Sequence, residues 1–335
     1  MSQIRQIAAE MVAPGKGVLA ADESIGTMDK RLEKAGVEPT EENRRAYREL
    51  LAGTPGLSEG ASGIILSDET MRQSFADGTP FPDATRAVGV LPGIKVDTGA
   101  KPFPGLPGET ITEGLDNLPA RMAEYAEMGA AFAKWRAVIT ISSGPDGELP
   151  TDAAIRANAH ALARYAAACQ EAGVVPIVEP EVLMDGSHSL ERCAEVTAAV
   201  HAAVFRELAD LNVDPAGMIL KPNMVIEGTE YGRESTPEQV AAAAVEVLKR
   251  NLPDDLAGVA FLSGGQSPER ATANLAAMQA HETPWPLTFS FGRALVDPAL
   301  KAWHGESSLV GAGQDALSER VRANAAAVRG EFQPA

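Results

Sequence analysis

Short apolar runs recur along the chain, and longer segments with helical signals separate them. The runs cover 17–22, 60–69, 88–97, 130–139, 173–181, 217–224, 258–265 and 285–295. Many begin at a glycine, and each is short and apolar, as strands buried on both faces are. The pattern therefore predicts eight parallel strands.

The segments between these runs begin and end like helices. Acidic residues follow Thr40, and Thr236 opens the capping-box sequence Thr-Pro-Glu-Gln. Ser267 precedes Pro and Glu in the same way, and an alanine-rich stretch from residue 151 stops at Gly173. Helices that alternate with single strands indicate β-α units and a parallel sheet.

Eight such units favour an α/β fold of the (β/α)8 or TIM-barrel type over a doubly wound sheet. We expect one domain over 1–335, with a short helix before the first strand and a helical extension after residue 296. The Pro- and Gly-rich stretch 98–109 follows the third strand, and it is either a rigid loop or part of the rim over a site.

Composition and charge exclude several classes of protein. Hydrophobic residues make up 45% and charged residues 22% of the chain, an ordinary globular mixture. There are 46 acidic and 29 basic residues, a net charge of −17, so we expect no nucleic-acid or membrane partner. Without a signal-type or spanning apolar run, the sequence predicts a cytoplasmic protein. Cys169 and Cys193 lie in helical stretches and are expected to be buried thiols.

Charged residues stand near the ends of five predicted strands. Three strands carry charges at i and i+2, which share one face: Lys95 with Asp97, Lys134 with Arg136, and Glu179 with Glu181. Two more strands end at Asp22 and Lys221. The carboxyl end of barrel strands is where such enzymes hold catalytic groups. A ring of solvated structural ion pairs is the alternative interpretation.

The residue types restrict the chemistry. The five histidines form neither HxH nor HExxH, and no CxxC occurs, so we expect no metal and no cofactor. A lysine that loses its proton beside another cation attacks a carbonyl to form a Schiff base. The iminium then accepts electrons from a breaking carbon–carbon bond while carboxylates move protons.

Glycines at the last two strand ends predict a phosphate site. Ser263, Gly264 and Gly265 follow the seventh strand, and Ser290, Gly292 and Arg293 follow the eighth. Many barrels bind phosphate at this position, where glycine lets backbone amides approach oxygens. Lys30 and Arg31 could hold a second phosphate, although a solvated helix face is the simpler interpretation of that pair.

The segments 19–24, 40–51, 93–99, 132–138, 175–181, 220–224, 261–267 and 287–295 resemble the class I fructose-1,6-bisphosphate aldolases. The resemblance runs in family order over about 3–330, and LKPNM, VEPE and LSGGQS are its most specific motifs. It implies reversible cleavage of fructose 1,6-bisphosphate to dihydroxyacetone phosphate and glyceraldehyde 3-phosphate, in glycolysis and gluconeogenesis. It also implies a phosphorylated sugar as substrate and a homotetramer.

The resemblance also implies roles for residues. Lys221 matches the Schiff-base lysine, Glu179 the proton donor and acceptor, and Asp22 the carboxylate that receives the C4 hydroxyl proton. Lys134 matches the lysine that holds the carbinolamine and makes the nucleophile easier to deprotonate. The C1-phosphate site corresponds to Ser263, Gly264, Gly265, Ser290, Gly292 and Arg293. Residues matching the other phosphate, the sugar hydroxyls or the rim are Arg31, Lys95, Arg136, Ser24, Thr27 and Glu181.

The sequence departs from the family pattern in three places. Animal members carry a tail whose terminal tyrosine assists enamine protonation, and no tyrosine follows Tyr231 here. We therefore expect another donor, or a slow final protonation. Phe291 replaces a tyrosine, and SDET at 67–70 replaces an HET-type segment.

Three alternatives to this activity remain at the level of sequence. A Schiff-base aldolase could prefer tagatose or sedoheptulose bisphosphate, because the motifs do not distinguish C4 epimers. A non-catalytic scaffold that binds sugar phosphates or proteins is a second possibility, and a metal-dependent aldolase is a third.

Overall fold

The strands of the protein close into a parallel barrel. The computed structural model describes residues 2–144 and 147–333. The strands follow one another around the ring in chain order, and the last pairs with the first. They are β1 (Gly17–Ala21), β2 (Ala61–Leu66), β3 (Leu91–Lys95), β6 (Phe132–Ile139), β9 (Val175–Val182), β10 (Ile219–Leu220), β11 (Gly258–Phe261) and β12 (Leu287–Phe291). Each coincides with a predicted apolar run, so the (β/α)8 prediction is confirmed.

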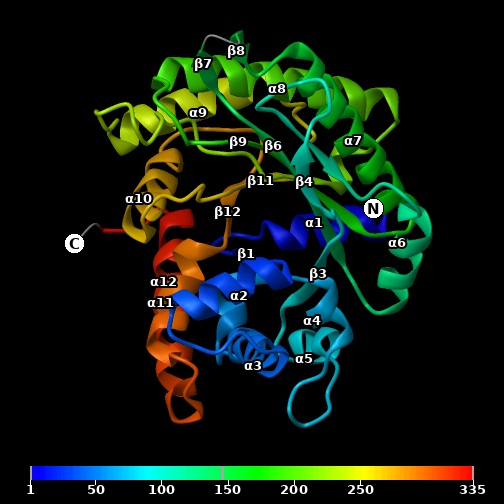
Figure 1. Ribbon diagram of the computed structural model, residues 1–335, viewed down its shortest axis with the longest axis vertical. Helices are drawn as coiled ribbons and strands as arrows, with labels where there is room; N and C mark the ends of the chain where they lie inside the picture. The colour runs from blue at the N-terminus through cyan, green and yellow to red at the C-terminus, as the bar shows by residue number, and fades with distance from the viewer. Residues whose placement is uncertain (1, 145–146, 334–335) are drawn as a thin grey trace.

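Helices surround this barrel, and Figure 1 shows them as an outer ring. They are α2 (Ile25–Lys34), α3 (Glu41–Ala52), α4 (Asp68–Arg72), α5 (Phe81–Ala87), α6 (Leu118–Glu127), α7 (Asp152–Glu171), α8 (Leu190–Asp210), α9 (Pro237–Asn251), α10 (Pro268–Met278) and α11 (Arg293–Trp303). The predicted short first helix is α1 (Gln3–Met11), and the C-terminal extension is α12 (Val310–Val328), which packs on α11. No helix in 2–144 or 147–333 is long and apolar enough to cross a bilayer.

Side-chain caps start the helices where the sequence predicted them. Thr40 accepts a hydrogen bond from the Asn43 amide, and Thr236 and Gln239 form the reciprocal capping box. Most of the predicted strands extend too far, and 217–224 is a strand only at Ile219–Leu220. Two of them end where a helix begins. The run 60–69 ends as a strand at Leu66, because Ser67 caps α4. The run 285–295 ends at Phe291, because α11 begins at Arg293.

The barrel interior is filled by an apolar layer near its amino-terminal end. Phe132 is completely buried there. A Cβ added at Gly63 or at Gly93 would overlap the Phe132 ring, so the two neighbouring strands need glycine beside it. Helix α1 closes this end: the Ser62 hydroxyl donates to the Met11 carbonyl over 2.6 Å. The carboxyl ends of the strands are left for the site.

The stretch 98–109 takes part in a small hairpin. Strand β4 (Gly99–Pro102) pairs antiparallel with β5 (Thr110–Glu113). The Thr112 hydroxyl donates to the Arg136 carbonyl, which holds the hairpin over the end of β6. A second hairpin, β7 (Ser142–Gly144) with β8 (Gly147–Leu149), follows β6.

Candidate active site

Alternate residues of a strand point to the same side, and on three strands this places charged side chains inside the barrel. Phe132 faces the interior on β6, so Lys134 shares its side. Glu179 lies two residues after Ile177, an interior residue of β9, so it is on the same side of the strand. Lys221 likewise lies two residues after Ile219, an interior residue of β10. The charged groups therefore stand directly above the apolar layer. Lys134 and Lys221 are each 4% exposed and Glu179 is 3% exposed, so these are not solvated strand-end charges.

Four of these side chains form a continuous row of ion pairs. Lys221 Nζ lies 3.1 Å from Glu179 Oε1. Lys134 Nζ lies 3.4 Å from Glu179 Oε2 and 2.6 Å from Asp22 Oδ2. Buried charges of this kind persist only when they are partnered. The structure thus brings together the four residues for which the sequence predicts catalytic roles.

The charges in this row determine which groups stay ionised. Burial alone would raise the pKa of Asp22, but the positive charges of Lys134 and Lys221 outweigh it and lower the pKa to about 2. Burial alone would lower the pKa of Lys134, but Asp22 and Glu179 raise it above the ordinary lysine value. At neutral pH, Asp22 is a carboxylate and Lys134 is an ammonium.

A cavity of about 500 Å³ opens over this row. Thirteen of the sixteen predicted site residues line it: Asp22, Thr27, Arg31, Lys134, Arg136, Glu179, Glu181, Lys221, Ser263, Gly264, Ser290, Gly292 and Arg293. Arg136 forms an ion pair with Glu181, which holds both at the wall. The remaining three, Ser24, Lys95 and Gly265, lie in neighbouring cavities.

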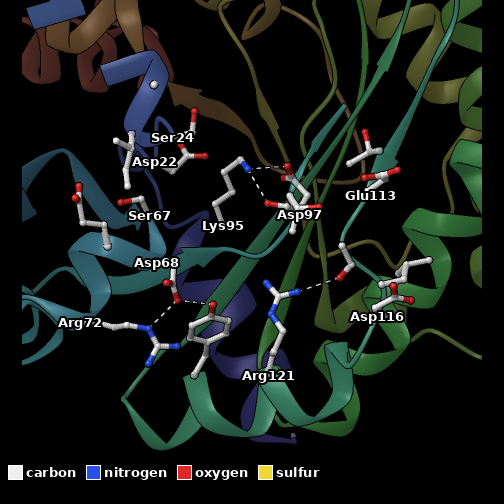
Figure 2. Close-up of a pocket in the computed structure, with 18 of the residues that line it drawn as sticks. Asp22, Ser24, Ser67, Asp68, Arg72, Lys95, Asp97, Glu113, Asp116 and Arg121 are labelled. Carbon is white, nitrogen blue, oxygen red and sulfur yellow. Dashed lines mark hydrogen bonds and ion pairs between the residues drawn. The ribbon is translucent and has the colours of Figure 1, made fainter. Parts of the chain in front are cut away.

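Lys95 pairs with Asp97 and forms no ion pair with the row in the described chain. Its ammonium lies 2.7 Å from Asp97 Oδ1 and donates to the Asp97 backbone carbonyl over 2.8 Å, as Figure 2 shows. Asp97 also accepts hydrogen bonds from the backbone amides of Gly99 and Arg136. Asp97 is thus a site residue that the list of candidates left out, although its i+2 spacing from Lys95 was the available signal.

Lys95 and Ser24 line a larger adjoining cavity of about 1240 Å³. The two cavities meet at Asp22, which lines both. Of the stretch 98–109, Thr98 alone lines this cavity. The hairpin also contributes Thr112 and Glu113 of β5 to the lining. Figure 2 shows Arg121 below it, donating to the Gly114 carbonyl.

The loops after β11 and β12 have the features of an anion site. Gly264 and Gly265 take φ values of +57° and +90°, which only glycine adopts readily. The Ser290 hydroxyl is buried and has no hydrogen-bond partner in the described chain. Arg293 is exposed at the cavity wall and forms no ion pair with the described residues. Its guanidinium lies close to Gly265, where an added Cβ would be 3.2 Å away.

Helix α2 supplies a second group of cations. Thr27, Lys30, Arg31 and Lys34 line the cavity, and their spacing of three and four residues places them on one helix face. Lys30 and Lys34 are exposed, as expected for a solvated helix face, and this face also lines the cavity. Lys34 was missed, although the same spacing predicts it. Arg31 is paired with Glu23 and with Asp297 of α11.

The described residues contain no group of three or more His, Cys, Asp or Glu side chains that could hold a metal ion. Cys169 and Cys193 are both buried free thiols, as expected. The side chains that line the smaller cavity carry amines, guanidinium groups, carboxylates and hydroxyls.

Comparison with known proteins agrees with this arrangement. A family profile described as "Fructose-bisphosphate aldolase class-I" matches residues 3–335. The chain is 50% identical over 335 residues to a probable fructose-bisphosphate aldolase class 1 of Xanthomonas axonopodis pv. citri, covering 99% of both chains. It is 51% identical over 328 residues to the cytoplasmic isozyme of Spinacia oleracea, covering 97% of this chain and 90% of that one.

A solved structure has the same fold as this chain. Fructose-bisphosphate aldolase from Plasmodium falciparum, crystallised with TRAP and a small-molecule inhibitor, superposes with a TM-score of 0.97 at 44% identity. The match covers 99% of this chain and 96% of that chain. From the barrel, the family profile and these relatives together, the chain belongs to the class I fructose-bisphosphate aldolase family.

Proposed function

We propose that this lyase reversibly cleaves fructose 1,6-bisphosphate into dihydroxyacetone phosphate and glyceraldehyde 3-phosphate, as a step of glycolysis and gluconeogenesis. The observation that best supports this is the buried row Lys221, Glu179, Lys134 and Asp22. It supplies an amine, two carboxylates and a second ammonium at the floor of one cavity.

Lys221 is the nucleophile in this mechanism. Its neutral amine attacks the C2 carbonyl and forms a carbinolamine. Glu179, 3.1 Å from the amine, is placed to transfer the protons that release water and leave an iminium. Lys134 stays charged beside Glu179, and this ammonium holds the carbinolamine oxygen.

Asp22 takes part in breaking the carbon–carbon bond. The C3–C4 bond breaks, its electron pair moves to the iminium to give an enamine, and the C4 hydroxyl proton passes to Asp22. Because the pKa of Asp22 is held at about 2, the carboxylate stays ionised until the C4 oxygen becomes a carbonyl and releases its proton. Hydrolysis after enamine protonation then frees dihydroxyacetone phosphate and regenerates Lys221.

The two phosphates are assigned to opposite walls. The C1 phosphate is bound by the strand-end loops, through Ser263, Gly264, Gly265, Ser290, Gly292 and Arg293. The other phosphate and the hydroxyls face the α2 wall and its neighbours, through Ser24, Thr27, Arg31, Lys95, Arg136 and Glu181. Lys95 must leave Asp97 to contact substrate in the smaller cavity.

Borohydride reduction in the presence of dihydroxyacetone phosphate, followed by peptide mapping, tests the covalent step. The expected product carries the label on Lys221. A Lys221→Met variant keeps the side-chain stem, so it should fold, trap no substrate and cleave none. Label on another lysine, or cleavage by the variant, would contradict the assignment.

The preference for fructose 1,6-bisphosphate is tested against its nearest relatives. Specificity constants for the fructose, tagatose and sedoheptulose bisphosphates should be measured side by side on one preparation. The fructose substrate should give the highest value. Equal or higher values for another ketose would transfer the proposal to that sugar, and no cleavage of any would favour a scaffold.

Location, assembly and domain structure complete the proposal. The name of the spinach relative supports a cytoplasmic location. A homotetramer is proposed from the family resemblance, and sedimentation of the purified chain measures it. One domain over 1–335 is proposed because β12 closes the ring against β1, so no strand can be removed without opening the barrel.

A further inference from the structure

The turn after β11 is held by one side chain beneath it. The Ser263 carbonyl accepts a hydrogen bond from the Gln266 backbone amide over 3.0 Å, which closes a tight turn around Gly264 and Gly265. The same carbonyl accepts a second hydrogen bond from Gln266 Nε2, also over 3.0 Å. Within the described chain, the amides of Gly264 and Gly265 have no backbone acceptor.

Gln266 is itself held from behind. Its Oε1 accepts a hydrogen bond from Asn274 Nδ2 over 2.7 Å. Asn274 lies on α10 and is completely buried, and Gln266 is 7% exposed. Gln266 Nε2 also lies 3.4 Å from the sulfur of Met224, three residues after Lys221. A buried polar chain thus runs from α10 to the turn that lines the cavity.

The hydrogen bonds from Gln266 to the Ser263 carbonyl also determine the direction of the Gly264 N–H. In a planar trans peptide, the carbonyl oxygen and the following N–H point in opposite directions. Fixing the Ser263 carbonyl towards Gln266 therefore fixes the Gly264 N–H in the opposite direction. Ser263 and Gly264 line the substrate cavity, whereas Gln266 lines the cavity behind the turn. The Gly264 amide is consequently directed towards the substrate side.

We propose that Gln266 and Asn274 are positioning residues for phosphate: they hold the Ser263–Gly264 peptide so that its N–H is presented to the substrate. This inference rests on the proposed function, since the phosphate is that of the aldolase substrate. Neither side chain touches substrate. Both act through the orientation of one backbone amide, which costs no reorganisation when the anion binds.

Gln266→Met is the test variant, because methionine has a similar length and cannot donate to the Ser263 carbonyl. The inhibition constant of inorganic phosphate and the KM for dihydroxyacetone phosphate should each rise roughly five- to tenfold. Borohydride trapping of unphosphorylated dihydroxyacetone should stay within about twofold of the parent enzyme. A Gln266→Met enzyme that binds phosphate normally, or that loses equally on both ketones, would overturn the inference.

Gln279→Met is the matched control. Gln279 follows α10, and its Nε2 donates to the Leu287 carbonyl over 3.1 Å at the start of β12, at the other end of the barrel. The substitution removes the same kind of hydrogen bond, so its phosphate inhibition should match the parent enzyme. A rise similar to that in Gln266→Met would show a general loss of order and contradict the proposed positioning role.

A second pair of variants covers the case in which Gln266→Met does not fold. Gln266→Glu keeps the acceptor for Asn274 but loses the donor to Ser263, so it should show the same phosphate defect. Asn274→Leu should show a smaller defect that is not additive with either Gln266 variant, because it acts through Gln266. Full additivity, or a normal Gln266→Glu enzyme, would contradict the proposal.

The two proposals fail differently. If the parent enzyme traps no dihydroxyacetone phosphate on Lys221, the proposed function fails while phosphate binding remains measurable by calorimetry. If the parent enzyme traps normally and Gln266→Met equals it in phosphate binding, only the positioning role fails.

Discussion

Lys134 is the residue on which the electrostatics of the site converge. Its ammonium lies between Asp22 and Glu179, and it lowers the pKa of Asp22 while its own pKa is raised. Glu179 also pairs with Lys221, the proposed nucleophile. One side chain therefore contacts both the carboxylate beside that lysine and Asp22, the carboxylate proposed to take the C4 proton.

Replacing Lys134 by alanine tests this role. We expect cleavage to fall by roughly 10²-fold or more. Borohydride trapping should fall as well, because no ammonium then lies beside Glu179 to hold the carbinolamine oxygen. The cleavage rate and the trapping yield at neutral pH are the measurements. Lys101→Ala, at an exposed lysine of β4, is the control that should keep both values. Normal cleavage and normal trapping by Lys134→Ala would contradict the role proposed for Lys134.

At the scale of elements, one face of α2 and the start of α11 line the same cavity. Helix α2 presents Lys30, Arg31 and Lys34, and α11 begins with Arg293 directly after Gly292, which follows β12. Asp297, one turn into α11, pairs with Arg31 and links the two helices. Arg31 is thereby paired with two carboxylates, whereas Arg293 forms no ion pair with the described residues.

Arg293→Ala should raise KM for the bisphosphate about 10- to 100-fold, the loss expected for a hydrogen bond to a charged group. Cleavage or trapping of an unphosphorylated ketose should change little. Lys301→Ala, at an exposed cation in the last turn of the same helix, is the matched control and should leave both substrates unaffected. Equal losses of Arg293→Ala on both substrates would make Arg293 a structural residue.

The packing between β3 and β6 gives an element-scale prediction of stability. A methyl group at Gly93 would overlap the Phe132 ring, so Gly93→Ala should lower the free energy of unfolding by about 1–3 kcal/mol. Gly311→Ala, where an added Cβ meets nothing within 4 Å, should be neutral or stabilising. Urea unfolding measures both. Adding Phe132→Leu to Gly93→Ala should restore part of the loss, and no recovery would argue against this contact.

At the scale of the whole molecule, a buried histidine outside the site contributes to the acid sensitivity of the fold. His201 on α8 is completely buried, and neither ring nitrogen has a hydrogen-bond partner in the described chain. Burial lowers its pKa to about 4, below the value near 6.5 in an unfolded chain. Between pH 6.5 and 4 the unfolded chain therefore binds more protons at this group than the folded protein does. The free energy of unfolding falls over this range as the pH is lowered.

We expect His201→Leu to reduce the acid sensitivity of the fold. The parent protein should lose up to about 3 kcal/mol through this one group between pH 6.5 and 4, and the variant should lose correspondingly less. Free energies of unfolding from urea titrations over this range measure the difference. Above pH 7, where the histidine is neutral in both the folded and the unfolded state, the free energies of unfolding of parent and variant should change with pH in the same way. Parallel curves throughout the acid range would refute the assignment.

The sequence by itself determined the strands, their order and the faces of their side chains. Continuous apolar runs specify buried strands, and the two-residue period puts Lys134, Arg136, Glu179 and Glu181 on the inward side. These are local properties, because each depends only on neighbours along one segment. For the same reason, the caps at Thr40 and Thr236 could be predicted residue by residue.

Only the tertiary structure decided which of these groups meet. Closure of the barrel brings Asp22 of the first strand end to Lys134 of the fourth, a contact that no local period contains. Packing of α2 places a solvated helix face at the wall of the cavity, and Lys95 pairs with Asp97 rather than with a member of the row. The link from Asn274 through Gln266 to Ser263 likewise forms because α10 packs behind the turn. The period of a strand determines the side to which each side chain points. Which other side chain it contacts depends on distances across the closed barrel.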